Sequence, residues 1–258
     1  MQTTIGASIA FAGIGLHSGR PSRIVIRPAA ADTGIRFRRT DAVDGDPVIP
    51  ARWSLVDRSP LCTRLVNADG VALSTVEHVM AALAGCGVHN AIIDVDGPEV
   101  PIMDGSAAPF VRGILSRGVD RLDAPVRAIE ILAPVTVRRD DASARLSPGR
   151  GLSMAFAIDF DEPGIGSQSR RIDLANGAFV RTLCDSRTFC RRADVDAMQG
   201  AGLALGGVPG ENAVVFDGPR IEAGKAGLRH EDEPVRHKML DALGDLALAG
   251  LPILGHYE

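Results

Sequence analysis

Short apolar runs bounded by proline and glycine divide the first half of the chain into strands and helices. Apolar residues that alternate with polar ones over a few positions are typical of half-buried strands. On this pattern, strands are predicted at 23–27, 34–38, 64–66, 71–73 and 90–95. The stretch 67–70, Asn-Ala-Asp-Gly, predicts a hairpin between two of them, because these residues favour tight turns.

Two helices are predicted in the same half, where apolar residues recur at helical spacing. The first covers about 76–84, with Ser74 or Thr75 as its N-cap and Gly85 as its C-terminal cap. The second covers about 106–116. Each follows a predicted strand, so this half has a strand-then-helix order.

The second half repeats this order. Its strands are predicted at 126–132, 135–139, 152–160 and 213–216, and its helices at 175–184, 194–200 and 232–249. The segment from Asp120 to Pro125 is polar and ends in a proline, so we place a domain boundary there. The chain is therefore predicted to be an α+β protein of layered sheets and helices, with two domains of similar topology that cover 1–122 and 126–258.

Composition removes several function classes. Of the 258 residues 45% are hydrophobic, and the net charge is −4, whereas a general nucleic-acid binder is normally basic. No apolar run approaches the ~20 residues that a membrane-spanning helix needs, and the first residues lack the basic region of a signal peptide. We expect a cytoplasmic protein that neither binds nucleic acid nor inserts stably into a membrane.

The cysteines restrict the kind of metal site that is possible. Cys62, Cys86, Cys184 and Cys190 are scattered and form no CxxC pair, which is typical of a reducing compartment and excludes a cysteine-rich zinc ribbon. Neither Cys62 nor Cys190 has a neighbouring histidine in sequence, so a thiol nucleophile has no support. Any metal site must use histidine and carboxylate side chains.

The predicted final helix carries three polar residues at helical spacing. His237, Asp241 and Asp245 lie four positions apart, which places them along one face of the helix. A histidine and an aspartate on adjacent turns can bind one metal ion together. The same spacing also fits a solvated face with a salt bridge along the helix, and the spacing alone does not separate these alternatives.

Glu77 and His78 begin the predicted helix at 76–84 and provide the second candidate for chemistry. Catalytic zinc usually takes three protein ligands and leaves one position for water, and His78, His237 and Asp241 would complete that number. Glu77 would then take a proton from the bound water. The alternative is a surface glutamate beside a packed histidine. Because imidazole binds both metals, zinc and iron fit this set equally.

Lys238 is one of two lysines in a chain that otherwise uses arginine as its cation. A lysine is a compact point charge, so one beside a metal-type histidine suits a substrate phosphate, and the alternative is an ordinary exposed lysine. The remaining histidines have weaker support. His17 lies in a glycine-rich turn that we interpret as closing two strands, and His89 and His230 are interpreted as loop residues.

Several motifs together resemble one family, the UDP-3-O-acyl-N-acetylglucosamine deacetylases of lipid A synthesis. They follow one another in the family's order from about residue 3 to residue 257. The matching stretches are 15–19 (GLHSG), 74–78 (STVEH), 97–107 (GPEVPIMDGSA), 186–189 (SRTF), 202–207 (GLALGG) and 236–246 (RHKMLDALGDL). Several of them are long and specific to the family.

The resemblance implies two α+β domains with the active site between them. Zinc would be bound by His78, His237 and Asp241, with iron as the alternative metal. Glu77 would act as the general base toward the metal-bound water, and Thr188 would stabilise the oxyanion that forms on the acetamide carbonyl. The products would be a free amine and acetate.

The resemblance also implies how the substrate, a UDP-linked acylated amino sugar, would be bound. Leu16 and Phe189 would line its groove with Cys62 near by, and Lys238 would face its diphosphate. A segment around 190–215 would form an apolar passage for the acyl chain. We expect the protein to be a monomer.

The C-terminal end differs from the family pattern. Members carry a further catalytic histidine after the last helix, oriented by the aspartate that matches Asp245, and then a closing helix. Here the sequence ends at Glu258, and His256 aligns with the strand before that segment. Loss of a general acid typically costs ~10²–10⁴-fold in rate. A metal-binding homologue with altered or no activity is therefore the alternative to a zinc deacetylase, and a structural protein without metal is a third.

Overall fold

Strands with alternating buried and exposed residues build a five-stranded sheet from the first half of the chain. The computed structural model describes residues 1–59 and 61–258. The strand order is β2 (Ile9–Ile14), β3 (Pro21–Pro28), β9 (Ala91–Asp96), β4 (Ile35–Arg39) and β5 (Val48–Pro50). Neighbouring strands are antiparallel except β9 and β4. Ile24 and Ile26 of β3 are buried whereas Arg23 and Arg27 are exposed, because successive side chains point to opposite faces.

A second sheet is built from the second half of the chain. Its order is β12 (Val135–Arg139), β13 (Ala142–Pro148), β19 (Ile253–Tyr257), β14 (Leu152–Asp159) and β15 (Ser167–Asp173), and β11 (Ile129–Glu130) also pairs with β19. The strand β19 runs parallel to β11 and β14 and antiparallel to β13. The last strand in sequence thus lies inside this sheet.

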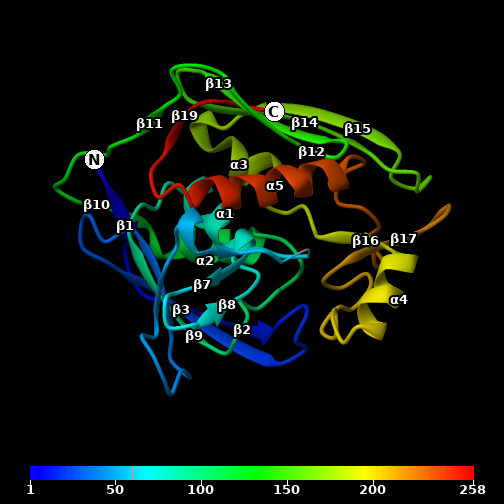
Figure 1. Ribbon diagram of the computed structural model, residues 1–258, viewed down its shortest axis with the longest axis horizontal. Coiled ribbons are helices and arrows are strands. Elements are labelled where there is room, and N and C mark those ends of the chain that lie inside the picture. The colour runs from blue at the N-terminus through cyan, green and yellow to red at the C-terminus, as the bar shows by residue number, and fades with distance from the viewer. Residues whose placement is uncertain (60) are drawn as a thin grey trace.

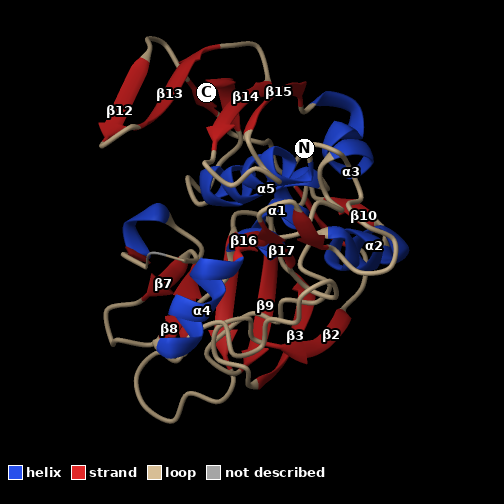
Figure 2. Cartoon of the chain, turned by 90° about the vertical axis from the view of Figure 1, so that its right-hand side faces the viewer, coloured by secondary structure: helices blue, strands red, loops and turns tan. Residues whose placement is uncertain are grey.

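A layer of helices separates the two sheets (Figures 1 and 2). In its middle, α1 (Glu77–Gly85) packs against α5 (Glu233–Ala247), and α2 (Ala108–Arg117) contacts α1. The other face of α5 contacts β14 and β15 of the second sheet. Because α1 and α5 are both buried between the sheets, polar residues at their contact are removed from bulk water.

The remaining elements are small and surround this layered core. They are β1 (Thr3–Ile5) paired with β10 (Val119–Arg121), the sheet of β6 (Val56–Asp57), β7 (Arg64–Val66) and β8 (Ala72–Leu73), the sheet of β16 (Phe189–Arg191), β17 (Val214–Asp217) and β18 (Arg220–Glu222), the helices α3 (Ala178–Thr182) and α4 (Arg192–Gly200), and the 3-10 turns η1 (Trp53–Leu55) and η2 (Ala175–Gly177). The α4 helix and the sheet of β16 and β17 form one side of the molecule (Figure 1).

The predicted α+β class is confirmed, and so are the helices that correspond to α1, α2 and α5 and the hairpin of β7 and β8. The predicted caps of α1 are wrong. Its N-cap is Val76, and Thr75 has a φ of 59° and donates its hydroxyl to Oε1 of Glu99 at 3.0 Å. Gly85 is the last helical residue, and the left-handed glycine after the helix is Gly87. A tertiary hydrogen bond therefore outweighs the local capping preference.

The second half contains strands that the pattern did not predict. The predicted strand 126–132 is reduced to β11, and β13, β15 and β19 were assigned no strand. The edge strand β15, with the sequence SQSRRID, is polar at most positions and so lacks the apolar alternation of a half-buried strand. The first sheet uses residues before 97 and the second uses residues after 128, and the proposed domain boundary near 120–125 stays a prediction.

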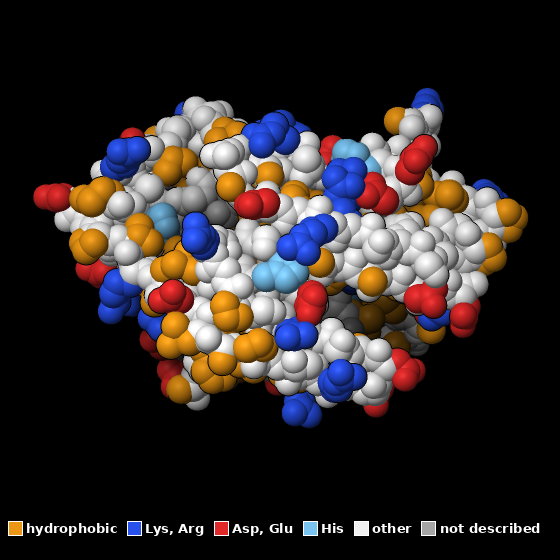
Figure 3. Space-filling view, turned by 90° about the horizontal axis from the view of Figure 1, so that it is seen from above, with side chains coloured by type: hydrophobic (Ala, Val, Ile, Leu, Met, Phe, Trp, Pro, Cys, Tyr) orange, Lys and Arg blue, Asp and Glu red, His pale blue; other side chains and the backbone are white. Residues whose placement is uncertain are grey.

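Two further features of the molecule are its surface charge and the lengths of its helices. On the face seen in Figure 3, basic and acidic side chains are interspersed. In the described part of the chain, we found no helix with both the length and the apolar character needed to cross a bilayer.

Candidate metal centre and active site

Four acidic or histidine residues of helix α5 are spaced one turn apart along the helix. Glu233, His237, Asp241 and Asp245 lie on successive turns of this helix. His237 is only 2% exposed and the Asp241 side chain only 22%, so the interpretation of this stripe as a solvated face is wrong. Glu233, His237 and most of Asp241 are removed from water and must find partners inside the protein, whereas Asp245 at the end of the stripe is exposed.

The start of α1 supplies that partner surface. Gly244 of α5 lies against the backbone of Glu77, and a Cβ built on Gly244 would overlap the Glu77 carbonyl oxygen. The absence of a side chain at Gly244 lets the two helices approach closely. This approach brings His78, which is 4% exposed, next to the polar stripe of α5.

His78, His237 and Asp241 form a compact set of potential metal ligands. The Nε2 atoms of His237 and His78 lie 3.3 and 3.5 Å from Oδ1 of Asp241, and their ring centroids are 5.0 Å apart with an interplanar angle of 89°. One ligand atom from each residue lies within 4.8 Å of the others. The buried Oδ1 atom has no hydrogen-bond partner among the described residues. Two imidazoles and a carboxylate aimed at one point are a donor set that zinc and iron both accept.

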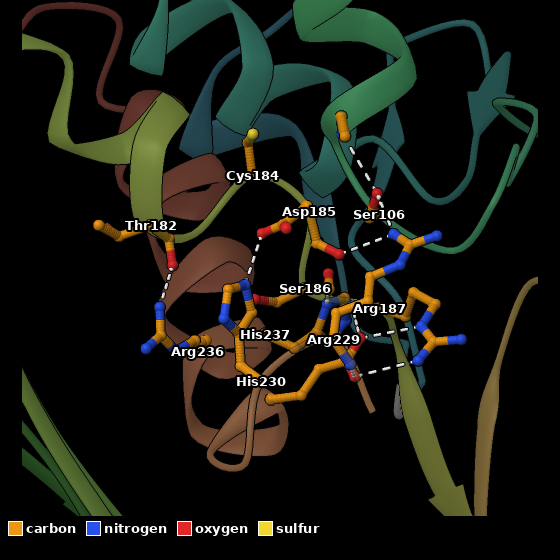
Figure 4. A network of polar contacts seen from close by, with 12 residues as sticks. Ser106, Thr182, Cys184, Asp185, Ser186, Arg187, Arg229, His230, Arg236 and His237 are labelled. Carbon is orange, nitrogen blue, oxygen red and sulfur yellow. Dashed lines mark hydrogen bonds and ion pairs between the residues drawn. The ribbon is translucent and has the colours of Figure 1, made fainter. Parts of the chain in front are cut away.

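The hydrogen bond on the far side of the His237 ring determines which nitrogen faces this point. Nδ1 of His237 lies 3.0 Å from the carbonyl oxygen of Ser186 (Figure 4). A carbonyl only accepts, so Nδ1 carries the proton and donates it. Burial lowers the pKa of His237 to about 4, so its ring is neutral near pH 7. Its Nε2 atom therefore presents a lone pair toward Asp241, as metal ligation requires.

The carboxylates of the site are in two different electrostatic environments. Burial opposes ionisation of Asp241, but His237, Lys238 and His78 together hold the pKa of its carboxyl well below its usual range. Burial raises the pKa of Glu77 to about 8 and that of Asp245 to about 6. Asp241 is thus an anion available for a cation, whereas Glu77 is a group that can hold a proton.

Glu77 is buried, so the alternative of a surface glutamate is wrong. Its Oε2 atom accepts a hydrogen bond from the backbone N of Thr63 at 3.1 Å. The hydroxyl of Thr63 donates to Oδ1 of Asp245 at 2.6 Å. Thr63 therefore connects the two carboxyl groups with raised pKa values. The residues around Thr63 in the sequence do not indicate this role, because a loop threonine carries no local signal of it.

A cavity of about 410 Å³ opens beside these residues. The site residues in its wall are Glu77, His78, Thr188, His237, Lys238 and Asp241. Leu16 and Phe189 also line it. Cys62 and Asp245 do not belong to this wall. The thiol of Cys62 contacts the hydroxyl of Ser59 at 3.6 Å, and Asp245 faces Thr63.

The segment predicted to hold an acyl chain contributes a group of apolar residues to the cavity wall, called here the apolar arm, with Arg191 and Asp194 beside them. Val195 and Met198 of α4 line it together with Val215 of β17 and the ring of Phe160. Phe189 and Phe160 meet edge to face, with ring centroids 5.7 Å apart. A cavity whose wall combines apolar residues with a polar, candidate metal-binding site suits a molecule with an acyl chain near its reacting group.

Lys238 lies at the border of the polar and apolar parts. Its Nζ atom is 3.3 Å from Oδ2 of Asp241 and 5.6 Å from the centre of the Phe189 ring. The side chain is 44% exposed, so its ammonium group stays accessible to a ligand in the cavity. A lysine ammonium group is a point charge on a flexible side chain, so Lys238 can attract an anionic ligand without a fixed hydrogen-bond geometry.

His17 also lines the cavity, although the sequence analysis interpreted it as part of a turn. Its turn does join β2 to β3, as predicted, and both ring nitrogens are buried without a hydrogen-bond partner among the described residues. Glu99 holds this turn, because its two oxygens accept the backbone N–H groups of His17 and Ser18 at 2.9 Å each. The GLHSG and GPEVP motifs marked both segments, but their contact was not readable from sequence.

Comparison with known proteins identified similar chains of one description. The family model for UDP-3-O-acyl N-acetylglycosamine deacetylase (LpxC) matches residues 2–258. A UDP-3-O-acyl-N-acetylglucosamine deacetylase of Phenylobacterium zucineum (strain HLK1) is 49% identical over 257 residues, which cover 100% of this chain and 87% of that protein. The protein of the same description from Pasteurella multocida (strain Pm70) is 45% identical, and the match covers 100% of this chain and 84% of that protein. The one from Anaeromyxobacter sp. (strain Fw109-5) is 47% identical, and the match covers 98% of this chain and 82% of that protein.

Proposed function

Because the chain belongs to the UDP-3-O-acyl-N-acetylglucosamine deacetylase family, we propose that it hydrolyses the N-acetyl group of a UDP-linked, 3-O-acylated glucosamine at the site of His78, His237 and Asp241. The chain is a metal-dependent amidohydrolase of lipid A biosynthesis. The observation that carries the assignment of the site is the convergence of a buried ligand set, a proton-holding carboxyl and a hydroxyl on the wall of one cavity.

The metal is zinc in this proposal, with iron as the alternative. His78, His237 and Asp241 would hold it, since their ligand atoms already face one another and Oδ1 of Asp241 is buried without a partner among the described residues. When bound there, the metal acidifies a water molecule and polarises the amide carbonyl. Three protein ligands leave a coordination position for that water.

The protein's own residues move the protons. Glu77 takes a proton from the attacking water as the new C–O bond forms, and the hydroxyl of Thr188 donates a hydrogen bond to the carbonyl oxygen as that oxygen gains charge. When the C–N bond breaks, Glu77 returns the proton to the leaving nitrogen. The products are acetate and a free amino sugar. Burial, which raises the pKa of Glu77 to about 8, favours a group that both accepts and returns a proton near neutral pH.

The cavity accounts for the rest of the substrate. Its apolar arm, lined by Val195, Met198 and Val215, would take the 3-O-acyl chain, and Leu16 and Phe189 would contact the sugar side. Lys238, accessible at the border of this arm, would face the diphosphate. Cys62 and Asp245 would act from outside the cavity wall, Asp245 by holding Thr63 beside Glu77.

The alternative of a non-catalytic, metal-binding homologue is not favoured. Glu77, Thr188 and Lys238 all lie on the cavity that holds the ligand set, whereas a site that only binds metal needs none of them. The match to the deacetylase family extends over residues 2–258.

Turnover of a defined substrate tests this function. The protein should release acetate from UDP-3-O-acyl-N-acetylglucosamine, lose activity with a chelator and regain it with Zn²⁺. Glu77→Gln should keep its metal, measured by elemental analysis, and lose ~10²–10⁴-fold in kcat, as removal of a general base typically does. Turnover no greater than that of Glu77→Gln would reject the proposal.

A further inference from the structure

A buried ion pair lies behind the cavity wall, on the side away from the substrate. The side chains of Arg187 and Glu233 are 5% and 1% exposed. Nε of Arg187 donates to Oε1 of Glu233 at 2.9 Å, and Nη2 donates to Oε2 at 3.1 Å. The remaining guanidinium hydrogen bonds go to the carbonyl oxygens of Ala223 and Gly227, both at 2.9 Å. Neither partner lines the cavity, so neither touches the substrate.

Each carboxylate oxygen of Glu233 accepts two hydrogen bonds. Besides the guanidinium, Oε1 accepts the backbone N–H of Arg187 at 2.9 Å, and Oε2 accepts that of Arg229 at 2.8 Å. The carboxylate is therefore surrounded by donors and fixes the backbone of two loops. Apolar residues of similar size often replace a buried ion pair without loss of stability, so stability alone does not explain this arrangement.

The backbone that this pair fixes is the one that carries site groups. Arg187 stands between Ser186, whose carbonyl oxygen orients the ring of His237, and Thr188, which lines the cavity. Glu233 lies one turn before His237 on the same helix. The pair thus ties the loop of Thr188 to the helical turn that precedes the metal ligands.

The main chain of Thr188 is anchored on both sides as well. Its N–H donates to the carbonyl oxygen of Gly105 at 2.8 Å, and its own carbonyl oxygen accepts the N–H of Val214 at 2.9 Å. The peptide before it is held by Glu233. These two hydrogen bonds hold Thr188 to Gly105 and Val214, and the Arg187–Glu233 pair links the same segment to α5.

We propose that Arg187 and Glu233 are positioning residues for the deacetylation, which set the place of the Thr188 hydroxyl relative to the metal ligands on α5. This inference rests on the proposed function. A hydroxyl that stabilises a developing charge must lie within hydrogen-bond distance of it, and a shift of about 1 Å can cost ~10²-fold in rate. The pair acts through Thr188 and so affects kcat more than substrate binding.

The variant Glu233→Gln removes the charge and keeps the shape. Each oxygen of the Glu233 carboxylate accepts hydrogen bonds from two N–H groups, and the NH₂ group of glutamine cannot accept any. Whichever way the amide is turned, its NH₂ group therefore lies against two N–H groups that lose their acceptor. The loop should shift, and kcat should fall ~10–100-fold, the usual effect of losing a group that orients a metal-site residue. KM should change less than threefold, because Lys238 and the apolar arm are untouched.

A double-mutant cycle with Thr188→Ala separates positioning from a general structural role. If Glu233 acts through Thr188, Glu233→Gln should lower kcat much less in the Thr188→Ala background than in the wild-type background. Equal fold-losses in both backgrounds, or an unchanged kcat of Glu233→Gln alone, would overturn the proposal. Absence of wild-type turnover would instead reject the proposed function itself.

Matched variants control for folding. Asp94 is also a buried carboxylate bound by two arginines, Arg27 and Arg38, but it lies on β9 and does not line the cavity. Asp94→Asn should leave kcat within twofold of wild type, and a loss of kcat as large as that of Glu233→Gln would count against positioning. If Glu233→Gln does not fold, Arg187→Lys is the second variant, because lysine keeps the positive charge but cannot form the paired hydrogen bonds of the guanidinium group. The same double-mutant cycle with Thr188→Ala is then carried out with Arg187→Lys.

Discussion

The carbonyl oxygen of Glu77 lies where a side chain on Gly244 would have to sit. This contact between the first turn of α1 and the last turns of α5 determines how far His78 is from Asp241. The metal site is therefore assembled by the packing of two helices, and changes at the contact should be detected as changes in metal binding.

Gly244→Ala should push α1 away from α5. Overpacking of this kind typically costs ~1–3 kcal/mol of stability, and the displacement of His78 should weaken metal binding as well. Zinc affinity by competition with a chelator and chemical unfolding would measure both effects. Gly200→Ala in α4 is the control, because a Cβ there meets nothing within 4 Å. It should lower neither the zinc affinity nor the stability. Wild-type zinc affinity in Gly244→Ala would show that the contact does not set the site.

His237→Ala should lose stoichiometric metal. The ring supplies one of three ligands, and the remaining pair, His78 and Asp241, is too small a set for stable zinc binding. Elemental analysis of protein purified without added metal measures this directly. His89→Ala is the control, since His89 contacts Thr3 and lies outside the ligand set, and it should keep its metal. Retention of one equivalent in His237→Ala would place the metal elsewhere.

Met198→Trp should shorten the apolar arm of the cavity. The larger ring occupies space that an acyl chain would use, so KM should rise at least tenfold for a long-chain substrate and change little for a short-chain analogue. Steady-state kinetics with both substrates gives the comparison. The neighbouring Gln199 is exposed and does not line the cavity, so Gln199→Trp should behave as wild type. An equal effect of Met198→Trp on both substrates would argue against this use of the arm.

The stability conferred by Asp94 should depend on pH. Burial opposes ionisation of Asp94, but Arg38 and Arg27 hold the pKa of its carboxyl below its usual range. A depressed pKa means that the contribution is complete above the unfolded pKa of about 3.9 and is lost as pH falls through the lower folded value. Because both arginines are about half exposed, the contribution at pH 7 should be about 1–2 kcal/mol, less than for a fully buried pair.

Urea unfolding of wild type and Asp94→Asn at pH 7 and near pH 3 measures this contribution. The difference between the two proteins should be largest at pH 7 and should shrink at the lower pH. Gly200→Ala, which alters no titratable group and whose Cβ meets nothing within 4 Å, is the control, and its difference from wild type should not change with pH. A difference that grows as pH falls would contradict the assigned direction.

Local spacing was sufficient for the parts of the site that lie on one element. His237 and Asp241 could be placed on one helical face because a helix repeats every 3.6 residues wherever it forms. The turn around His17 and the hairpin of β7 and β8 were likewise readable, since turn residues act within a few positions. The family resemblance added His78, Thr188 and the substrate class to these local inferences.

Contacts between distant segments were decided by the tertiary structure. Thr75 donates to Glu99 instead of capping α1, and the polar strand β15 pairs with β14 at the edge of the second sheet. Glu233 and Arg187 are 46 positions apart, and nothing in either neighbourhood indicates that they pair. Helical periodicity depends on bonds within one segment, whereas burial of Glu77 and the facing of His78 toward Asp241 depend on the packing of α1 on α5, which no local pattern encodes.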